Sequence, residues 1–461
     1  MLIWIPYPLP MTRRLPKRCW RTLMHTKFLS AFITLLILLS PCMAQATPGI
    51  QYWTTAQGTR VYFVRTEGLP MVDLRVVFAA GSVYDGAQHG VASLTSALLD
   101  SEAGKWNADE IAQRLDSVGA VMETSVSKDT GSLYLRSLTD PDKLNVAVET
   151  LHAILTQPLF TAQDFERQKR QVLLGLQEKE ESPGDLAEVI YAKAIYGDHP
   201  YGHPTDGEIG TVSKLTRNDL IKFYQRYYVA ANAVVAVVGD LARADAETIV
   251  ERVLAGLPQG APAETLPTVA EPLAANTVKR FSPSTQTHVL VGEPVLSFND
   301  PDYFPLYVGN HILGGSGLVA RITQEVREKR GLSYSANSHF FPRAGKGPFT
   351  IRLQTRNGQT DRAMKVMMET TNKFIAEGPT DKELEAAKQN IVGGFVLRID
   401  NNRKIAEYMA TIGFYGLPLD YLNTFTAKVQ SVTVADIVKA FKARVDPARF
   451  QTVLVGGAAG Q

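Results

Sequence analysis

The sequence contains almost no cysteine. Only Cys19 and Cys42 occur among its 461 residues, and both lie in the first 46. The remaining chain can therefore form neither an internal disulfide nor a metal site built from thiolates.

An excess of charge of one sign is also lacking. The 48 lysine and arginine residues nearly balance 46 aspartate and glutamate residues, and no basic run is interleaved with aromatic side chains. This pattern argues against a nucleic-acid-binding protein. The composition is that of an ordinary globular protein, and the length predicts two to three domains, each able to bury a core.

The apolar run in the leader, residues 28–39, is short for a membrane span. It follows six basic residues with no acidic one, and it precedes Ala44, Gln45 and Ala46, the small-x-small pattern of a signal-peptidase site. We expect residues 1–46 to be a signal peptide cleaved after Ala46, and the protein to be periplasmic or otherwise exported. An uncleaved membrane anchor is the main alternative.

Beyond the leader, strand and helix patterns alternate. Strands are predicted over 60–66, 72–81, 121–127, 131–138 and 233–240, helices over 89–99, 107–118, 141–155, 161–181, 185–196 and 217–227, and a loop over 199–210. Hairpins combined with long helices favour an α+β fold in which mostly antiparallel sheets carry helices.

The same succession recurs in the second half. Thr161 and Thr380 lie 219 residues apart, as do Tyr196 and Tyr415, and the register holds across several elements. This indicates an internal duplication. We therefore predict a first domain over 47–256, a linker over 257–276 that is rich in Pro, Ala and Glu, and a second domain over 277–461.

The stretch from Leu313 to Tyr334 carries the candidate chemistry. Three glycines, Gly314, Gly315 and Gly317, predict a flexible turn before an amphipathic helix that sets Arg327 and Tyr334 seven residues apart. The guanidinium and the phenol could both donate hydrogen bonds to a peptide carbonyl. Taken alone, an arginine and a tyrosine at this spacing are more often surface and packing residues.

Several strings carry a resemblance to a known family. They are FAAGSVYD, GVASLTSALL, HPYGHPTDGEIG and GSGLVARITQEVREKRGLSYS. With the repeat, they resemble the insulinase, pitrilysin and mitochondrial processing peptidase family of zinc metallopeptidases over nearly the whole chain beyond the leader. The resemblance implies two homologous αβ-roll domains that make half of a clam-shell. It also implies that Arg327 and Tyr334 are the arginine and tyrosine that face a zinc site across the chamber.

The zinc motif of the family is degenerate in this chain. The family's His-x-x-Glu-His positions fall on Ser93, Ser96 and Ala97, and the later glutamate ligand falls near Gly175. Because serine is a poor zinc donor and alanine and glycine are none, we expect no metal or other cofactor in this chain. His199 and His203 are separated by Pro200 and Gly202, which forbid a shared helix face, so we expect a structural role in a loop.

The resemblance implies a subunit that completes the active site of a zinc-bearing homologous peptidase subunit, in a heterodimer or larger assembly that cuts unstructured peptides. Zinc is then expected in the partner. Gly314, Gly315 and Gly317 would allow close backbone approach to the substrate or act as a hinge, with a tight helix-entry turn as the alternative. Two other functions stay open: a structural scaffolding subunit, and a self-sufficient metallopeptidase with another metal site.

Overall fold

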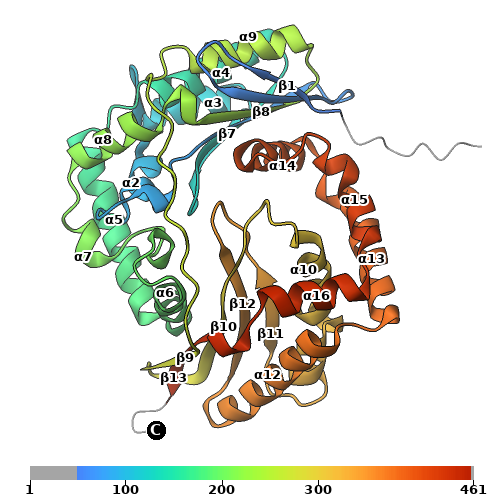
Figure 1. The fold of residues 1–461 in the computed structure, drawn as a ribbon. Helices are drawn as coiled ribbons and strands as arrows, with labels where there is room; N and C mark the ends of the chain where they lie inside the picture. The colour runs from blue at the N-terminus through green and yellow to red at the C-terminus, as the bar shows by residue number, and fades with distance from the viewer. Residues whose placement is uncertain (1–48, 458–461) are drawn as a thin grey trace, which may run out of the picture. The chain divides into compact units, whose positions relative to one another are not determined.

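The computed structural model describes residues 49–457 (Figure 1). The predicted signal peptide lies outside these residues. Within 49–457, no helix has the length and apolar character needed to cross a membrane.

A first sheet forms the centre of the first half. Its strands run in the order β1-β2-β8-β3-β7-β6, and all neighbours are antiparallel except β2 and β8. The strands are β1 Gln51–Thr54, β2 Arg60–Arg65, β3 Met71–Phe78, β6 Val121–Val126, β7 Gly131–Leu138 and β8 Ala233–Gly239. Every residue of β8 is buried, as expected for a strand in the middle of a covered sheet.

Helices of the first half cover one face of this sheet and share one hydrophobic core with it. They are α2 Val91–Leu98, α3 Ala108–Ser117, α4 Pro141–Thr156, α5 Ala162–Glu181, α7 Ile209–Val212, α8 Arg217–Tyr227 and α9 Arg243–Leu254, with a small hairpin of β4 Glu102–Ala103 and β5 Trp106–Asn107. Asn107 caps α3 and Thr161 caps α5 through their side chains, which is why these helices begin where the sequence predicts.

The second half repeats the plan. Its sheet has the order β11-β12-β10-β13-β9, again antiparallel except for one pair, β13 and β9. The strands are β9 Asn276–Phe281, β10 Ser284–Leu296, β11 Ser335–Phe340, β12 Gly347–Arg356 and β13 Gln451–Gly457. The helices are α10 Tyr303–Asn310, α11 Arg321–Thr323, α12 Thr360–Glu377, α13 Asp381–Phe395, α15 Tyr421–Ser431 and α16 Val434–Arg444. The matching strand orders confirm the predicted α+β fold with an internal duplication.

Two equivalent helices are exchanged between the halves. Helix α6, Pro183–Tyr196, and helix α14, Asn402–Tyr415, lie 219 residues apart at both ends. Helix α6 packs on β10 and β13 of the second sheet, whereas α14 packs on β3 and β8 of the first. One hydrophobic cluster therefore joins Tyr62 and Val234 of the first sheet to Met409 of α14.

The six helices predicted for the first half are present with ends within two residues of the prediction. The predicted loop over 199–210 is only partly correct, because it contains a helical turn at Pro200–Gly202 and the start of α7. Proline opens the first of these turns, where its missing N–H is no loss. Residues 255–275, between α9 and β9, contain neither helix nor strand.

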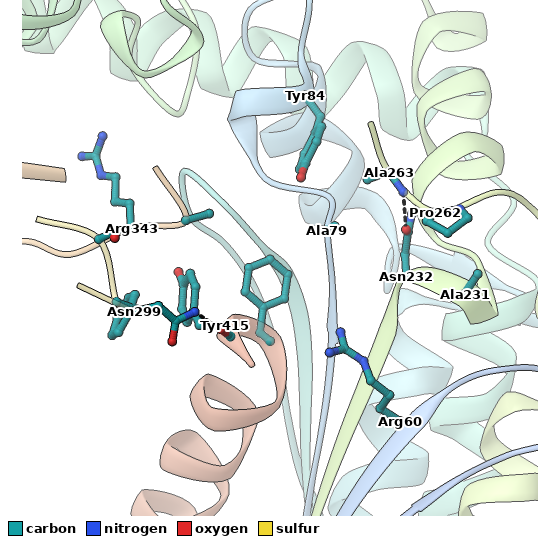
Figure 2. Close-up of a pocket in the computed structure, with 14 residues that line it drawn as sticks. Arg60, Ala79, Tyr84, Ala231, Asn232, Pro262, Ala263, Asn299, Arg343 and Tyr415 are labelled. Atoms are coloured by element: carbon teal, nitrogen blue, oxygen red, sulfur yellow. Dashed lines mark hydrogen bonds between the residues drawn. The ribbon is translucent and has the colours of Figure 1, made fainter. Parts of the chain in front are cut away.

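A cavity of about 340 Å³ lies where the halves meet (Figure 2). The side chains of Arg60, Tyr84 and Tyr415 point toward it, and the segment around Ala263 crosses one side. Ala263 is held there because its N–H donates to Asn232 Oδ1 at 2.5 Å. The cavity shows that the first half, the connecting segment and the end of α14 meet at one place.

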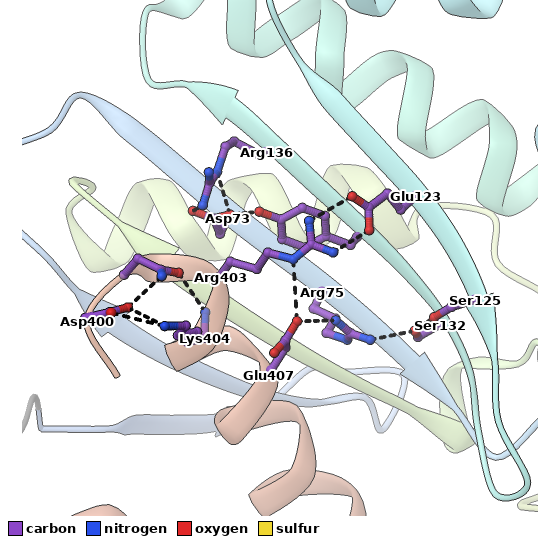
Figure 3. A network of polar contacts seen from close by, with 12 residues as sticks. Asp73, Arg75, Glu123, Ser125, Ser132, Arg136, Asp400, Arg403, Lys404 and Glu407 are labelled. Carbon is purple, nitrogen blue, oxygen red and sulfur yellow. Dashed lines mark hydrogen bonds and ion pairs between the residues drawn. The ribbon is translucent and has the colours of Figure 1, made fainter. Parts of the chain in front are cut away.

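A polar network holds α14 on the first sheet (Figure 3). Arg403 of α14 donates to Glu123 Oε1 at 2.7 Å and lies over the ring of Tyr134 at 4.5 Å. Asp73, which is fully buried, accepts from Tyr134 Oη and from Arg136 Nε. Each charge in the network has an opposite charge beside it, so burial of the helix against the sheet leaves no ion unpaired.

Two helical glycines should respond oppositely to replacement by alanine. A Cβ at Gly413 in α14 would lie 2.5 Å from a ring carbon of Tyr62 and 2.6 Å from a methyl of Val234, whereas a Cβ at Gly393 in α13 would meet nothing within 4 Å. We expect Gly413→Ala to destabilise the protein by about 1–3 kcal/mol through overpacking. We expect Gly393→Ala to stabilise it by about 0.5–1 kcal/mol through helix propensity. Urea denaturation of both variants measures the two changes, and equal shifts would contradict the exchanged-helix packing.

Candidate active-site pair and the degenerate zinc site

Arg327 and Tyr334 are brought together. Helix α11 continues as a wide π-helical turn, Gln324–Glu328, which carries Arg327, and Tyr334 immediately precedes β11. The guanidinium carbon of Arg327 lies 4.7 Å from the centroid of the Tyr334 ring, which is cation–π geometry. Tyr334 is 82% exposed, so the phenol is presented to solvent.

The segment between the two residues is fixed by its backbone. Gly331, with a φ of +60°, turns the chain, and its N–H donates to Arg327 O at 2.8 Å. Leu332 is buried, and its carbonyl accepts from Thr355 Oγ1 at 2.5 Å. Ser333 Oγ lies 2.7 Å from Gln354 O of β12. These contacts tie the turn to the second sheet and set the position from which Tyr334 projects.

The three glycines do not form one flexible turn, so that prediction is wrong for two of them. Gly314 and Gly315 lie in a π-helical turn, His311–Gly315. A Cβ at Gly314 would overlap the backbone and side chain of Ser338 in β11, which explains why only glycine fits there. Gly317 alone has a turn conformation, with a φ of +67°, and faces open space. A contact of these glycines with substrate stays a prediction.

The degenerate zinc positions lie on two packed helices. Ser93, Ser96 and Ala97 are on α2, and Gly175 is on α5, which packs against α2. Ser93 Oγ donates to Asp206 Oδ1 at 3.3 Å, and Ser96 is buried. Neither Ala97 nor Gly175 offers a donor atom, so these residues do not fit a zinc ion.

No group of three or more His, Cys, Asp or Glu side chains able to hold a metal occurs within residues 49–457. The start of α2 is instead held by Asp85, whose carboxylate accepts from the N–H groups of Gly90 and Ala92 at 2.7 and 3.0 Å. Burial raises the pKa of Asp85 to about 7, although these two hydrogen bonds favour the ionised form.

The histidines beside this helix form a stacked pair that pattern reasoning missed. The rings of His89 and His203 are parallel, with centroids 3.7 Å apart, and His203 Nε2 lies 3.3 Å from Ser82 O. Burial, with smaller contributions from His89 and Lys128, lowers the pKa of His203 to about 3. His199 does not take part in this stacked pair, and its Nε2 lies 3.0 Å from Pro267 O. His199 and His203 therefore share no site, and their contacts are those of loop packing.

Comparison with known proteins decides the family. A family model described as insulinase (peptidase family M16) matches residues 60–208, and one described as peptidase M16 inactive domain matches residues 214–391. A crystal structure of a peptidase M16 inactive domain from Pseudomonas fluorescens is 37% identical, with a TM-score of 0.86 over 89% of this chain and 98% of that chain. This chain belongs to peptidase family M16.

Other similar proteins are less identical in sequence. Uncharacterized zinc proteases of Streptomyces coelicolor and Mycobacterium leprae are 27% and 29% identical, covering 76% and 80% of this chain and 77% and 83% of theirs. A protease from Helicobacter pylori, 20% identical, has the same fold, with a TM-score of 0.82 over 89% of this chain and all of that chain. The M16 assignment thus rests on most of both halves.

Proposed function

We propose that this chain is an exported M16 subunit that has no zinc of its own and supplies Arg327 and Tyr334 to the active site of a zinc-bearing homologous subunit. The observation that carries the proposal is a contrast between the two halves. Arg327 and Tyr334 stack on each other at the surface, while the zinc positions hold Ser93, Ala97 and Gly175.

The two side chains suit stabilisation of a developing negative charge. The Arg327 guanidinium offers several N–H donors in a fixed plane. The Tyr334 ring, held against it, presents one O–H donor in an exposed position. Both groups donate to the carbonyl oxygen of the scissile peptide as it becomes an oxyanion. Polarisation of the carbonyl and activation of water belong to the zinc of the partner.

Unstructured peptides are the substrates that this arrangement suits. One edge of the first sheet is β6 and one edge of the second is β11, and no further strand among residues 49–457 pairs with either. Exposure alternates along β6, so one set of its side chains is accessible beside the free backbone edge. An extended peptide adds to such an edge through main-chain hydrogen bonds, which gives binding with weak sequence preference.

The test is peptide hydrolysis by the complex that co-purifies with this chain and by the chain alone, with a short quenched fluorescent peptide. We expect activity only in the complex, lost on zinc chelation and restored by added zinc. An inactive complex that nevertheless contains a zinc-bearing partner would favour the scaffolding function. Activity and bound zinc in the isolated chain would favour a self-sufficient peptidase.

A further inference from the structure

Two cavities follow one another on the face of the second sheet that α6 covers. Both lie between α6 and strands β11 and β12. The first, about 490 Å³, is lined by Ser335 and Asn337, directly after Tyr334. The second, about 400 Å³, is lined by Phe341 and Arg343 beyond the end of β11. Both are lined by Glu188 and Arg352, so they are neighbours across this pair. We call the two cavities together the trough.

The trough runs away from the candidate active site along β11. Ser335 and Asn337 face it, whereas Ala336 and Ser338, between and after them, are buried toward the helices of the second half. From Ser335 to Phe341 the chain advances six residues, which spans about 20 Å in an extended strand. A peptide lying along the trough in extended form covers the same distance in about six residues.

The acceptors at the far end of the trough are already committed. Asp129 accepts from Tyr201 Oη at 2.5 Å, from Tyr415 Oη at 2.9 Å and from the N–H of Ala344 at 3.0 Å. Glu188 pairs with Arg352 at 2.7 Å. A ligand that enters here therefore meets few free acceptors for its own donors.

One cation at the far end is uncommitted. Among residues 49–457, the Arg343 guanidinium has no hydrogen bond and no ion pair; it packs on the ring of Tyr201 at 4.7 Å. Lys128 lines the same cavity, and burial, followed by the charge of Arg343, lowers its pKa to about 8. The carboxylates of Asp85, Asp206 and Asp129 offset the charge of Lys128, and its Nζ donates to His203 O. The Nη1 atom of Arg343, in contrast, is buried without a hydrogen-bond partner, so an acceptor-only group in the cavity would satisfy it.

We propose that the far end of the trough binds a carboxylate of the substrate peptide through Arg343, with Lys128 beside it. The proposal rests on the proposed function, because it names a feature of the same substrate. Apolar side chains in this cavity, including Ile195 and Phe341, suit the body of a peptide more than a bare anion. The bound carboxylate would lie about six residues from the scissile peptide bond beside Tyr334. This distance favours short peptides with an acid at that position.

Binding to the isolated chain tests the carboxylate site without partner or zinc. Three fluorescein-labelled peptides share one acid-free sequence: one has a free C-terminus, one is amidated, and one is amidated but carries a single internal glutamate. By fluorescence anisotropy, we expect the free-acid peptide to bind about tenfold more tightly than the amidated one, as for one charge-assisted hydrogen bond. Binding of the glutamate peptide shows whether side-chain carboxylates are also accepted.

Arg343→Gln should remove the preference for the acid and leave the amidated peptide unaffected. The matched control is Arg356→Gln, an exposed arginine at the end of β12, which should keep the preference. Equal affinity of the wild-type chain for acid and amide, or an equal loss for both peptides in Arg343→Gln, would overturn the proposal. Thermal unfolding of each variant checks that it is folded.

The two proposals can fail separately. An inactive complex together with Arg343-dependent acid binding would refute the completing-subunit function and leave the carboxylate site in place. An active complex whose kcat/KM for acid and amide peptides is unchanged by Arg343→Gln would refute the site alone.

Discussion

Tyr334→Phe is expected to lower the kcat of the reconstituted complex by about a hundredfold, because one preorganised donor to the oxyanion is lost. The substitution removes only the hydroxyl. The ring stays in place to pack against the Arg327 guanidinium, so the local fold and the assembly with the partner should be unchanged. The measurement is kcat and KM on a quenched fluorescent peptide, with size-exclusion chromatography to verify assembly.

A matched control separates this effect from general loss of a tyrosine hydroxyl. Tyr52 on β1 is 42% exposed, and its hydroxyl lies 3.1 Å from Thr54 Oγ1, far in sequence from the candidate pair. Tyr52→Phe should leave kcat unchanged. Full activity in Tyr334→Phe would refute the catalytic assignment. A rise in KM with unchanged kcat would show that Tyr334 contributes to substrate binding and not specifically to stabilisation of the transition state.

The sequence predicts much of the fold because its strongest signals are local. Continuous apolar residues mark β8 as a covered strand, and side-chain caps such as Asn107 and Thr161 mark where helices begin. The duplication is also visible in the sequence, because equivalent residues such as Thr161 and Thr380 lie a constant 219 residues apart. Each of these signals acts within one element or between two copies of it.

The exchange of α6 and α14 could not be predicted in this way. A helical period shows that a helix has an apolar face, but the period does not show which sheet covers that face. Met409 of α14 would have suited a core in either half, and it lies in the cluster that includes Val234 of the first sheet. The choice depends on the shapes of surfaces far apart in sequence, such as the space above Gly413.

The same distinction between local signals and tertiary contacts applies to the candidate site. Arg327 and Tyr334 are visible in the sequence, because they lie seven residues apart on one continuous segment. The glycine segment was misjudged because the close approach of Ser338 to Gly314 is a tertiary contact. Arg343 was missed entirely, since nothing near it in sequence shows that Lys128 lies beside it.

Asp129→Ala is expected to destabilise the chain by about 3 kcal/mol, because a buried carboxylate that accepts hydrogen bonds from both halves is lost. Asp129 is 3% exposed and sits in the turn between β6 and β7. Its donors include Tyr415 at the end of α14 and the N–H of Ala344 in the turn between β11 and β12. Without the carboxylate, the Tyr415 hydroxyl loses its bond while α14 still packs on the first sheet.

The duplication gives this contact a counterpart. Tyr196, the equivalent of Tyr415, ends α6 and donates to Lys346 O in the turn of the second half at 3.1 Å. Each exchanged helix is thus fastened at its end to a hairpin turn of the half on which it packs, but only Asp129 provides a charged acceptor. Urea denaturation measures the loss, with Asp198→Ala as the control, because Asp198 is exposed and pairs with the equally accessible Lys193. Equal midpoints for the two variants would show that Asp129 does not join the halves, since removal of a fully exposed carboxylate should leave the midpoint unchanged.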